Sequence, residues 1–502
     1  MTSTEFDSRS AWRALWALVI GFFMVLLDTT IVSMAMPAIM GSLETDLTAI
    51  IWVNSAYLLA FAVPLLVTGR LGDRFGPRNI YLVGLTVFTL ASLWCGLSPS
   101  IGHLIAARVL QGLGAAMMSP QSMTLITRLF PYARRGAAMG VWGAVAGIAS
   151  LIGPIAGGVL VDTLGWQWIF FINLPVGVLT FILVQRWVPQ LPIHSASFDW
   201  VGVALSAVAM FALVFGIQEG DATGWQPFIG PLSSVHLIII GLVLFAVFIW
   251  WQAETRKEPL VPLGLFSVRN FSLANIGICF MGLAITTMGL PMIFYLQSVR
   301  ALTPTQAALL LAPMAVVAAI CAPVIGKSVT RHDPRVFAVP GFALFGGGIV
   351  AFALLMHAET PLWLLLIPSA IQGVGSALIW PSLSLAATRD LGPANAGAGS
   401  GVYNTTRQIG AVLGSALIAV LMQARITAQI RAQELGSGAE AMPDVSGELV
   451  PGVALPTALH EPISVGLGQA LLMPGLVALA AVLVVTFFRS QSTVATKSVP
   501  RG

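Results

Sequence analysis

The sequence has 502 residues, of which 57% are hydrophobic and only 9% are charged, and its formal net charge is +4. A soluble domain carries about 25% charged residues, so this composition excludes an ordinary soluble protein and indicates a polytopic membrane protein. The 50 glycines and 30 prolines are spread through apolar runs, which favours a bundle of kinked, closely packed helices over a β-barrel. The three cysteines have no paired spacing, so neither a disulfide framework nor a metal site is predicted.

Apolar runs of about twenty residues, the length that crosses a bilayer as a helix, recur along the whole chain. They predict fourteen transmembrane helices, at 14–39, 50–69, 79–98, 101–126, 136–160, 168–187, 201–218, 233–251, 271–297, 304–326, 337–357, 361–387, 398–424 and 464–488.

The first predicted span contains one acid, Asp28, in a run otherwise free of charge. A carboxylate inside the bilayer costs at least about 2.5 kcal/mol, so an intramembrane acid is a candidate for function. Burial raises the pKa of a carboxyl group and a nearby cation lowers it, so such a group can take up and release protons. We therefore predict that Asp28 carries the coupling proton. The alternative is a structural carboxylate that caps backbone groups or stays paired with Arg108.

The turn after the second predicted span contains Asp73, Arg74 and Arg78, with glycines at Gly72 and Gly76 that permit tight backbone geometry. An acid here can sit against the N-terminus of a helix from the other half of the protein, where the helix dipole favours negative charge. We predict a conformational latch on the cytoplasmic side. The alternative is that these are ordinary charges that only fix membrane orientation.

Arg108, in the fourth predicted span, is the basic residue that we place inside the membrane. A buried guanidinium needs a partner, and Asp28 is the acid at a similar depth. We predict an Asp28–Arg108 contact that loosens when Asp28 is protonated. The alternative is that Arg108 binds backbone carbonyls and only fixes helix packing.

The fifth predicted span contains Gly153, Pro154, Gly157 and Gly158, which allow close helix approach and a kink. Amide and aromatic side chains in the predicted spans are candidates for the wall of a substrate cavity, because amides are disfavoured against lipid; each is equally well explained as an interhelical hydrogen bond. The cavity candidates are Asn54, Tyr57, Gln111, Gln121, Trp142, Asn275, Gln297, Gln372, Trp380, Tyr403, Asn404 and Gln408.

Lysines and arginines predict the orientation. With the N-terminus inside, twenty fall in cytoplasmic segments, Arg407 among them, and three fall outside. The positive-inside rule therefore predicts that both termini are cytoplasmic. This placement accounts for the basic balance, so no nucleic-acid partner is needed. A stretch at about 433–463, rich in glycine, proline and acids, is predicted to be an extracytoplasmic loop.

The sequence repeats itself. The residues 69–78 recur at 326–335, 257 residues later, and 111–114 recur at 372–375, 261 residues later. The repeat predicts two parallel six-helix halves, the arrangement of carriers that rock one bundle against the other. We expect an N-terminal bundle at 1–190, a linker with two extra helices at 191–260, and a C-terminal bundle at 261–502.

These motifs resemble the major facilitator superfamily, in particular its fourteen-helix drug:proton antiporters. The resemblance covers nearly the whole chain and is carried by residues 27–37, 69–78, 108–114, 153–158 and 166–175. Pro77 and Asn79 depart from it where basic residues are usual, and Ala149 stands where glycine is common. The resemblance implies the major facilitator fold in the cytoplasmic (inner) membrane, acting as a monomer among membrane lipids.

The preferred function is proton-coupled efflux of lipophilic small molecules, which the resemblance extends to antibiotics, dyes and disinfectants. The runner-up is export of a lipid, a cell-envelope precursor or a secreted natural product, and a non-transporting membrane sensor is the alternative from another class. The sequence has no GxxxxGK[ST] phosphate loop, so ATP is not expected to drive transport. It has no HExxH or CxxC metal spacing and no room for a catalytic domain, so we expect no cofactor, no metal and no enzyme activity.

Overall fold

The computed structural model describes residues 8–45, 47–191, 199–222, 227–229, 232–255, 259–389, 391, 396–437 and 457–489. Within these ranges the protein is helical except for one short antiparallel hairpin. The helical prediction is therefore confirmed.

The elements before the linker are α1 (Ser8–Ser42), α2 (Leu47–Ala62), α3 (Leu65–Phe75), α4 (Pro77–Gly96), α5 (Ile101–Leu129), α6 (Tyr132–Leu164), α7 (Trp168–Phe171) and α8 (Asn173–Trp187). The insert consists of α9 (Trp200–Ala222), β1 (Pro227–Ile229), β2 (Leu232–Ser233) and α10 (Ser234–Glu254). The remaining elements are the 3₁₀ turn η1 (Leu263–Ser267), α11 (Arg269–Phe294), the π-helical turn η2 (Tyr295–Val299), α12 (Pro304–Val329), α13 (Arg335–Leu354), α14 (Leu362–Thr388), α15 (Ala396–Ser437) and α16 (Thr457–Thr486).

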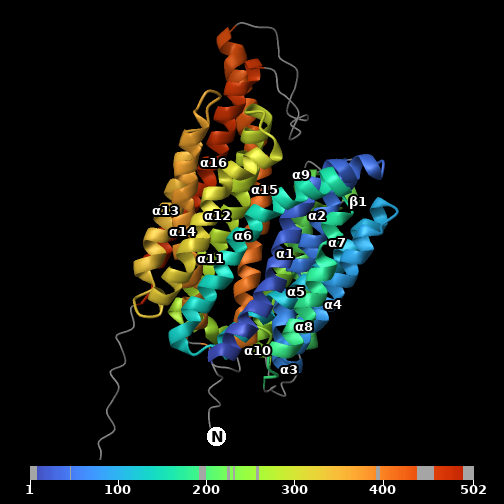
Figure 1. Ribbon diagram of the computed structural model, residues 1–502, viewed down its shortest axis with the longest axis vertical. Coiled ribbons are helices and arrows are strands. Elements are labelled where there is room, and N and C mark those ends of the chain that lie inside the picture. The colour runs from blue at the N-terminus through green and yellow to red at the C-terminus, as the bar shows by residue number, and fades with distance from the viewer. Residues whose placement is uncertain are drawn as a thin grey trace, which may run out of the picture.

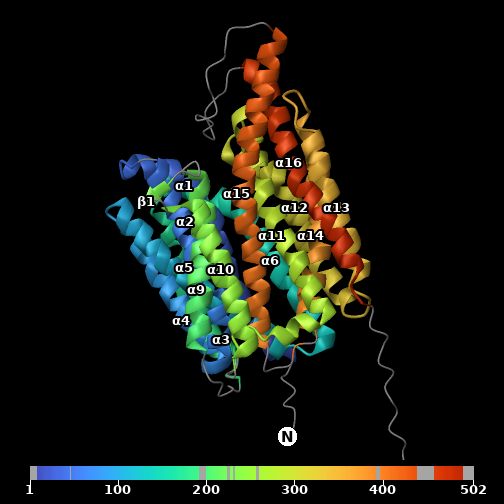
Figure 2. The same cartoon turned by 180° about the vertical axis from the view of Figure 1, so that it is seen from behind.

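Figure 1 shows two groups of helices side by side, with α1 to α5, α7 and α8 in one, α11 to α14 and α16 in the other, and α6 and α15 between them. We call α1 to α8 the N-terminal bundle and α11 to α16 the C-terminal bundle. Figure 2 shows α9 and α10 on the opposite face of the molecule. Every predicted span coincides with a helix or with a broken pair of helices. Among the described residues, eleven helices are long and apolar enough to cross a membrane, or twelve if α2 and α3 form one span. The count of fourteen spans stays a prediction.

One predicted span is broken: the span at 50–69 divides into α2 and α3 around Pro64, which cannot donate a backbone hydrogen bond. The span at 168–187 remains one span. Only Ile172 separates α7 from α8, and its φ and ψ of −59° and −26° are helical.

The bounds predicted for the loop, about 433–463, are too wide at both ends. α15 continues to Ser437 and α16 begins at Thr457, while the residues between them lie outside the described ranges. Arg407, which we assigned to a cytoplasmic segment, lies about three turns inside α15. Arg407 lies near the predicted start of a span, and the sequence prediction assigns it to the cytoplasmic side. In the structure it lies on a helix within the bundle.

The internal repeat is confirmed by equivalent contacts in the two bundles. Each pair below consists of a glycine and the residue that it approaches. Between the two bundles the glycines are 261 residues apart in the sequence and their neighbours are 257 residues apart, so equivalent helices cross in the same way. The equivalent pairs are Gly112 with Tyr57 and Gly373 with Met314, Gly114 with Phe88 and Gly375 with Phe345, and Gly153 with Thr30 and Gly414 with Thr287.

The two bundles also meet through equivalent positions. A Cβ on Gly140 of α6 would meet the carbonyl oxygen of Ala322 in α12, and a Cβ on Gly401 of α15 would meet that of Leu65 in α3. These contacts lie at the end of the molecule where α1 begins and α16 ends. We call it the basic end, because most lysines and arginines are predicted on this side, and we call the opposite end the far end. The bundles are thus joined by α6 with α12 and by α3 with α15.

Candidate functional site

A buried ion pair lies in the N-terminal bundle. Nη1 of Arg108 on α5 donates to Oδ2 of Asp28 on α1 at 2.5 Å, and both side chains are fully buried. Nε of Arg108 donates to the carbonyl oxygen of Val53 at 3.1 Å, and the guanidinium lies 4.0 Å from the centre of the Tyr57 ring. The guanidinium is therefore held by a carboxylate, a backbone carbonyl and an aromatic face.

Two amide side chains complete the shell around Asp28. Nε2 of Gln111 and Nδ2 of Asn173 both donate to Oδ1 of Asp28, at 2.8 and 3.0 Å. The same two nitrogens donate to Oγ of Ser92, at 2.8 and 3.3 Å. Oε1 of Gln111 accepts from Nη1 of Arg108 at 2.6 Å. The carboxylate is thus surrounded by hydrogen-bond donors.

Helix geometry explains why these residues converge. Arg108 and Gln111 are three residues apart on α5, so they share one face of the helix. Ser92 faces them from α4, and Asn173 reaches the site because it is the first residue of α8. Four helices therefore supply the cluster, which we call the Asp28 network: Asp28, Ser92, Arg108, Gln111 and Asn173.

The glycine motif of α6 packs beside this network. Gly153 is buried, and a Cβ there would overlap the side chain of Thr30, two residues beyond Asp28. Gly157 is also buried, whereas a Cβ on Gly158 would meet nothing within 4 Å. Pro154 lies inside α6, but its side chain is outside the described residues. Close approach of α6 to α1 is thus the structural role of Gly153.

The three predicted latch residues have separate partners. Oδ1 of Asp73 accepts from Nη2 of Arg128 at 2.7 Å. Arg74 lies over the ring of Phe75, and Nη2 of Arg78 donates to the carbonyl oxygen of Gln185 at 2.5 Å. The turn between α3 and α4 is Gly76 alone, whose positive φ of 89° suits glycine. The latch function remains a prediction.

Several cavity candidates lie where the two bundles meet. Trp142 of α6 and Trp380 of α14 form an edge contact with ring centres 6.3 Å apart, and Trp142 also stacks on Phe22 of α1. Nδ2 of Asn404 on α15 lies 3.7 Å from Sδ of Met123 on α5. Tyr403 and Gln408 are buried on the same helix α15. Trp142, Trp380 and Asn404 are thus the candidates with contacts between the bundles.

Other cavity candidates lie elsewhere. Gln121 donates to the carbonyl oxygen of Thr68 at 2.6 Å and so links α5 to α3. Asn275 donates within its own helix to the carbonyl oxygen of Phe271. The remaining three are Asn54, half-buried on α2, Gln297, buried in η2, and Gln372, buried against Gly348.

Sequence reasoning missed Asn173 and Ser92 as members of the site. Asn173 was noted only as part of the motif at 166–175, yet an amide at the start of an apolar run was a signal that it needs a polar partner. Ser92 gave no signal, since buried serines commonly bond to their own helix. Arg70 was also missed: its Nε and Nη2 donate to the carbonyl oxygen of Pro259 at 3.1 and 2.6 Å, which ties α3 to the segment after α10.

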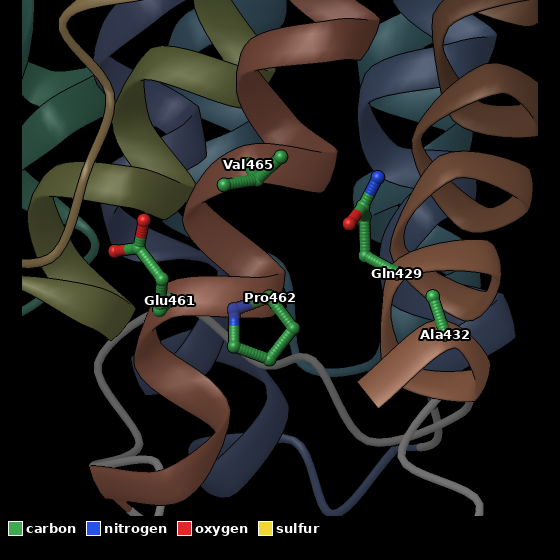
Figure 3. Close-up of a pocket in the computed structure, with 5 residues that line it drawn as sticks. All are labelled: Gln429, Ala432, Glu461, Pro462 and Val465. Atoms are coloured by element: carbon green, nitrogen blue, oxygen red, sulfur yellow. The ribbon is translucent and has the colours of Figure 1, made fainter. Parts of the chain in front are cut away.

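A pocket of about 320 Å³ lies at the far ends of α15 and α16. Figure 3 shows Gln429 facing the space between the two helices, whereas the carboxylate of Glu461 is turned away from it. That carboxylate accepts from Nδ1 of His357 at 2.7 Å and from the backbone nitrogen of Ala358 at 2.8 Å. None of the cavity candidates lines this pocket, so it is separate from the Asp28 network.

A family model described as the Major Facilitator Superfamily matches residues 18–415. An uncharacterized MFS-type transporter of Mycobacterium tuberculosis is 47% identical over 479 residues, which cover 95% of this chain and 81% of that protein. The tetracenomycin C resistance and export protein of Streptomyces glaucescens is 33% identical over 513 residues, covering 95% and 91% of the two chains. The crystal structure of the human organic anion transporter MFSD10 has the same fold, with a TM-score of 0.60, 13% identity and coverage of 93% of this chain and 99% of that one.

Proposed function

The chain belongs to the major facilitator superfamily and is a multi-pass membrane transporter rather than an enzyme, and we propose that it is a proton-coupled antiporter that exports lipophilic small molecules. We place it in the cell membrane with both termini in the cytoplasm. Efflux is supported by relatives named for antibiotic resistance and export.

The observation that carries proton coupling is the buried contact between Asp28 and Arg108. Removal of one partner from a buried ion pair leaves an uncompensated charge, which costs about 3–5 kcal/mol. A proton that reaches Asp28 therefore changes the local free energy by enough to redistribute two conformations, and it frees Arg108 at the same time. Protonation and substrate binding can then compete by favouring different conformations.

Alternating access is supported by the way the bundles meet. The glycine contacts of α6 with α12 and of α3 with α15 lie at the basic end, which we assign to the cytoplasm. Nη1 of Arg135 also donates to the carbonyl oxygen of Thr388 across this end, at 3.3 Å. We propose that this conformation is closed to the cytoplasm and that rocking about the contacts between the bundles opens it.

The substrate is expected to contact the aromatic groups between the bundles. Trp142 and Trp380 offer flat apolar surface, and Asn404 offers a polar group at another contact between the bundles. This chemistry suits lipophilic, aromatic compounds such as antibiotics and dyes. Export of a lipid or cell-envelope precursor has no observation of its own in its favour.

Proton release on substrate binding tests the proposal. Ethidium and tetracenomycin C are added separately to purified protein in weakly buffered detergent, and a pH-sensitive dye reports released protons. We expect release from the wild type and none from Asp28→Asn; a cooperative thermal unfolding transition, at a lower temperature than that of the wild type, shows that the variant is folded. Absence of release from the wild type with both probes, or equal release from Asp28→Asn, would contradict proton-coupled export.

A further inference from the structure

All neighbours of Asp28 in its network present hydrogen-bond donors to it. Arg108 has only donors, and Gln111 and Asn173 turn their amide nitrogens toward Oδ1. A protonated carboxyl group gains an O–H, which needs an acceptor. A buried donor without an acceptor costs about 1–3 kcal/mol. The network as it stands is therefore compatible with the ionised carboxylate and not with the protonated one.

Ser92 fixes the orientation of both amides. Its hydroxyl hydrogen is donated to the carbonyl oxygen of Phe88 at 2.9 Å, which leaves Oγ as an acceptor. Gln111 and Asn173 each use one amide hydrogen for Ser92 and the other for Asp28. The carbonyl oxygen of Gln111 is already bonded to Arg108, so Gln111 is fixed from both sides. Oδ1 of Asn173 accepts no hydrogen bond from the residues that the structure describes.

We propose that Asn173 is a positioning residue that reads the charge of Asp28, and that Ser92 sets its orientation. The proposal rests on the proposed function, in which Asp28 carries the proton. When Asp28 is ionised, Nδ2 of Asn173 donates to it. When Asp28 takes up a proton, the amide of Asn173 rotates and Oδ1 accepts from the new O–H. The hydroxyl of Ser92 then turns away from Phe88 and donates to Oδ1 of Asn173.

The position of Asn173 gives this rotation a mechanical consequence. Asn173 is the first residue of α8, and the ring centre of Phe170 in α7 lies 5.9 Å from the guanidinium of Arg108. Residues on both sides of Ile172 therefore contact the ion pair. A change of partner at Asn173 is thus passed directly to the start of α8.

Infrared difference spectroscopy between high and low pH tests the proposal without any substrate. We expect the wild type to show a protonated-carboxyl band that Asp28→Asn abolishes, together with a shift of an asparagine amide carbonyl band. Asn173→Leu should lose the amide shift and keep the carboxyl band. Asn270→Leu, which removes another buried asparagine from the C-terminal bundle, should keep both.

The outcomes separate the two proposals. A missing carboxyl band would overturn the role of Asp28, whereas a carboxyl band without an asparagine shift would overturn the role of Asn173 alone. If Asn173→Leu does not fold, carbon-13 labelling of asparagine in the wild type shows whether the shifted amide band belongs to asparagine. Ser92→Ala should lose the amide shift and Ser92→Thr, which retains the hydroxyl, should restore it; a full shift in Ser92→Ala would overturn the role of Ser92.

Discussion

The two bundles have equivalent helix crossings and different chemistry. Gly153 meets Thr30 in one bundle, and Gly414 meets Thr287 in the other. This match places the apolar residue Ile285 at the position of Asp28. Close glycine contacts therefore hold both bundles in the same fold, whether or not a charge is present.

The residue equivalent to Arg108 in the C-terminal bundle is also uncharged. Ser369 stands at the equivalent position, where its Oγ donates to the carbonyl oxygen of Leu311 at 3.3 Å and accepts from the backbone nitrogen of Met314 at 3.2 Å. A serine satisfied by its own surroundings suffices for packing. The ion pair in the N-terminal bundle is thus not required by the fold, and its burial points to function.

The largest expected difference between the bundles comes from removing the arginine. Arg108→Ala leaves Asp28 buried without its cation, which should lower the free energy of unfolding by about 3–5 kcal/mol and abolish export driven by a pH gradient. Ser369→Ala should cost only about 0.5–1.5 kcal/mol and leave the pH dependence of export unchanged. Thermal unfolding in detergent and ethidium export from vesicles measure both effects. Equal losses in the two variants would erase the contrast between the bundles.

The second difference concerns the insert. Arg70 is buried and binds the carbonyl oxygen of Pro259 through two nitrogens, whereas Lys327 at the equivalent position is exposed. Arg70→Ala should cost about 1.5–3 kcal/mol because a charge-assisted contact is lost. Hydrogen exchange should accelerate in the segment 259–265, which follows α10. Lys327→Ala should stay within about 0.5 kcal/mol of the wild type. Unchanged exchange in Arg70→Ala would mean that α3 does not anchor the insert.

The third difference separates packing from coupling. Gly153→Val and Gly414→Val both place atoms against a threonine, so each should lower the free energy of unfolding by about 1–3 kcal/mol. Only Gly153→Val pushes on the segment of α1 that contains Asp28, so only this variant should also alter the pH dependence of ethidium export. The same pH profile in both variants would show that proton coupling does not depend on the contact between α6 and α1.

The sequence is sufficient to predict the charged residues of the site, because charges inside apolar runs are rare. A carboxylate and a guanidinium in apolar runs are costly, so Asp28 and Arg108 were predicted to meet, and they do. Gln111 is predicted only as a cavity candidate or an interhelical hydrogen bond, and its bond to Asp28 on α1 fits the second alternative. The repeat was visible because its glycines serve backbone contacts, which tolerate no other residue at the same distance.

The rest depended on tertiary structure. Asn173 is 145 residues from Asp28 in the sequence, and the two side chains meet only because α8 packs against α1. The location of Arg407 was wrong because hydropathy alone does not tell whether a charge near the end of a span lies in the loop or in the helix. Contacts such as Arg70 with Pro259 depend on how the insert folds back, which local sequence does not specify.

The smallest expected effect is at the glutamine that both bundles share. Gln111 and Gln372 occupy equivalent positions, but Nε2 of Gln372 has no hydrogen-bond partner among the described residues. Gln372→Leu replaces an unsatisfied buried donor with an apolar group of similar size, so the free energy of unfolding should rise or change by less than about 1 kcal/mol. Gln111→Leu removes bonds to Asp28 and Arg108 and should be destabilising by about 1.5–3 kcal/mol. Thermal unfolding of the two variants, measured side by side, compares one residue type in two surroundings. A larger loss from Gln372→Leu would show that the C-terminal bundle contains a polar network of its own.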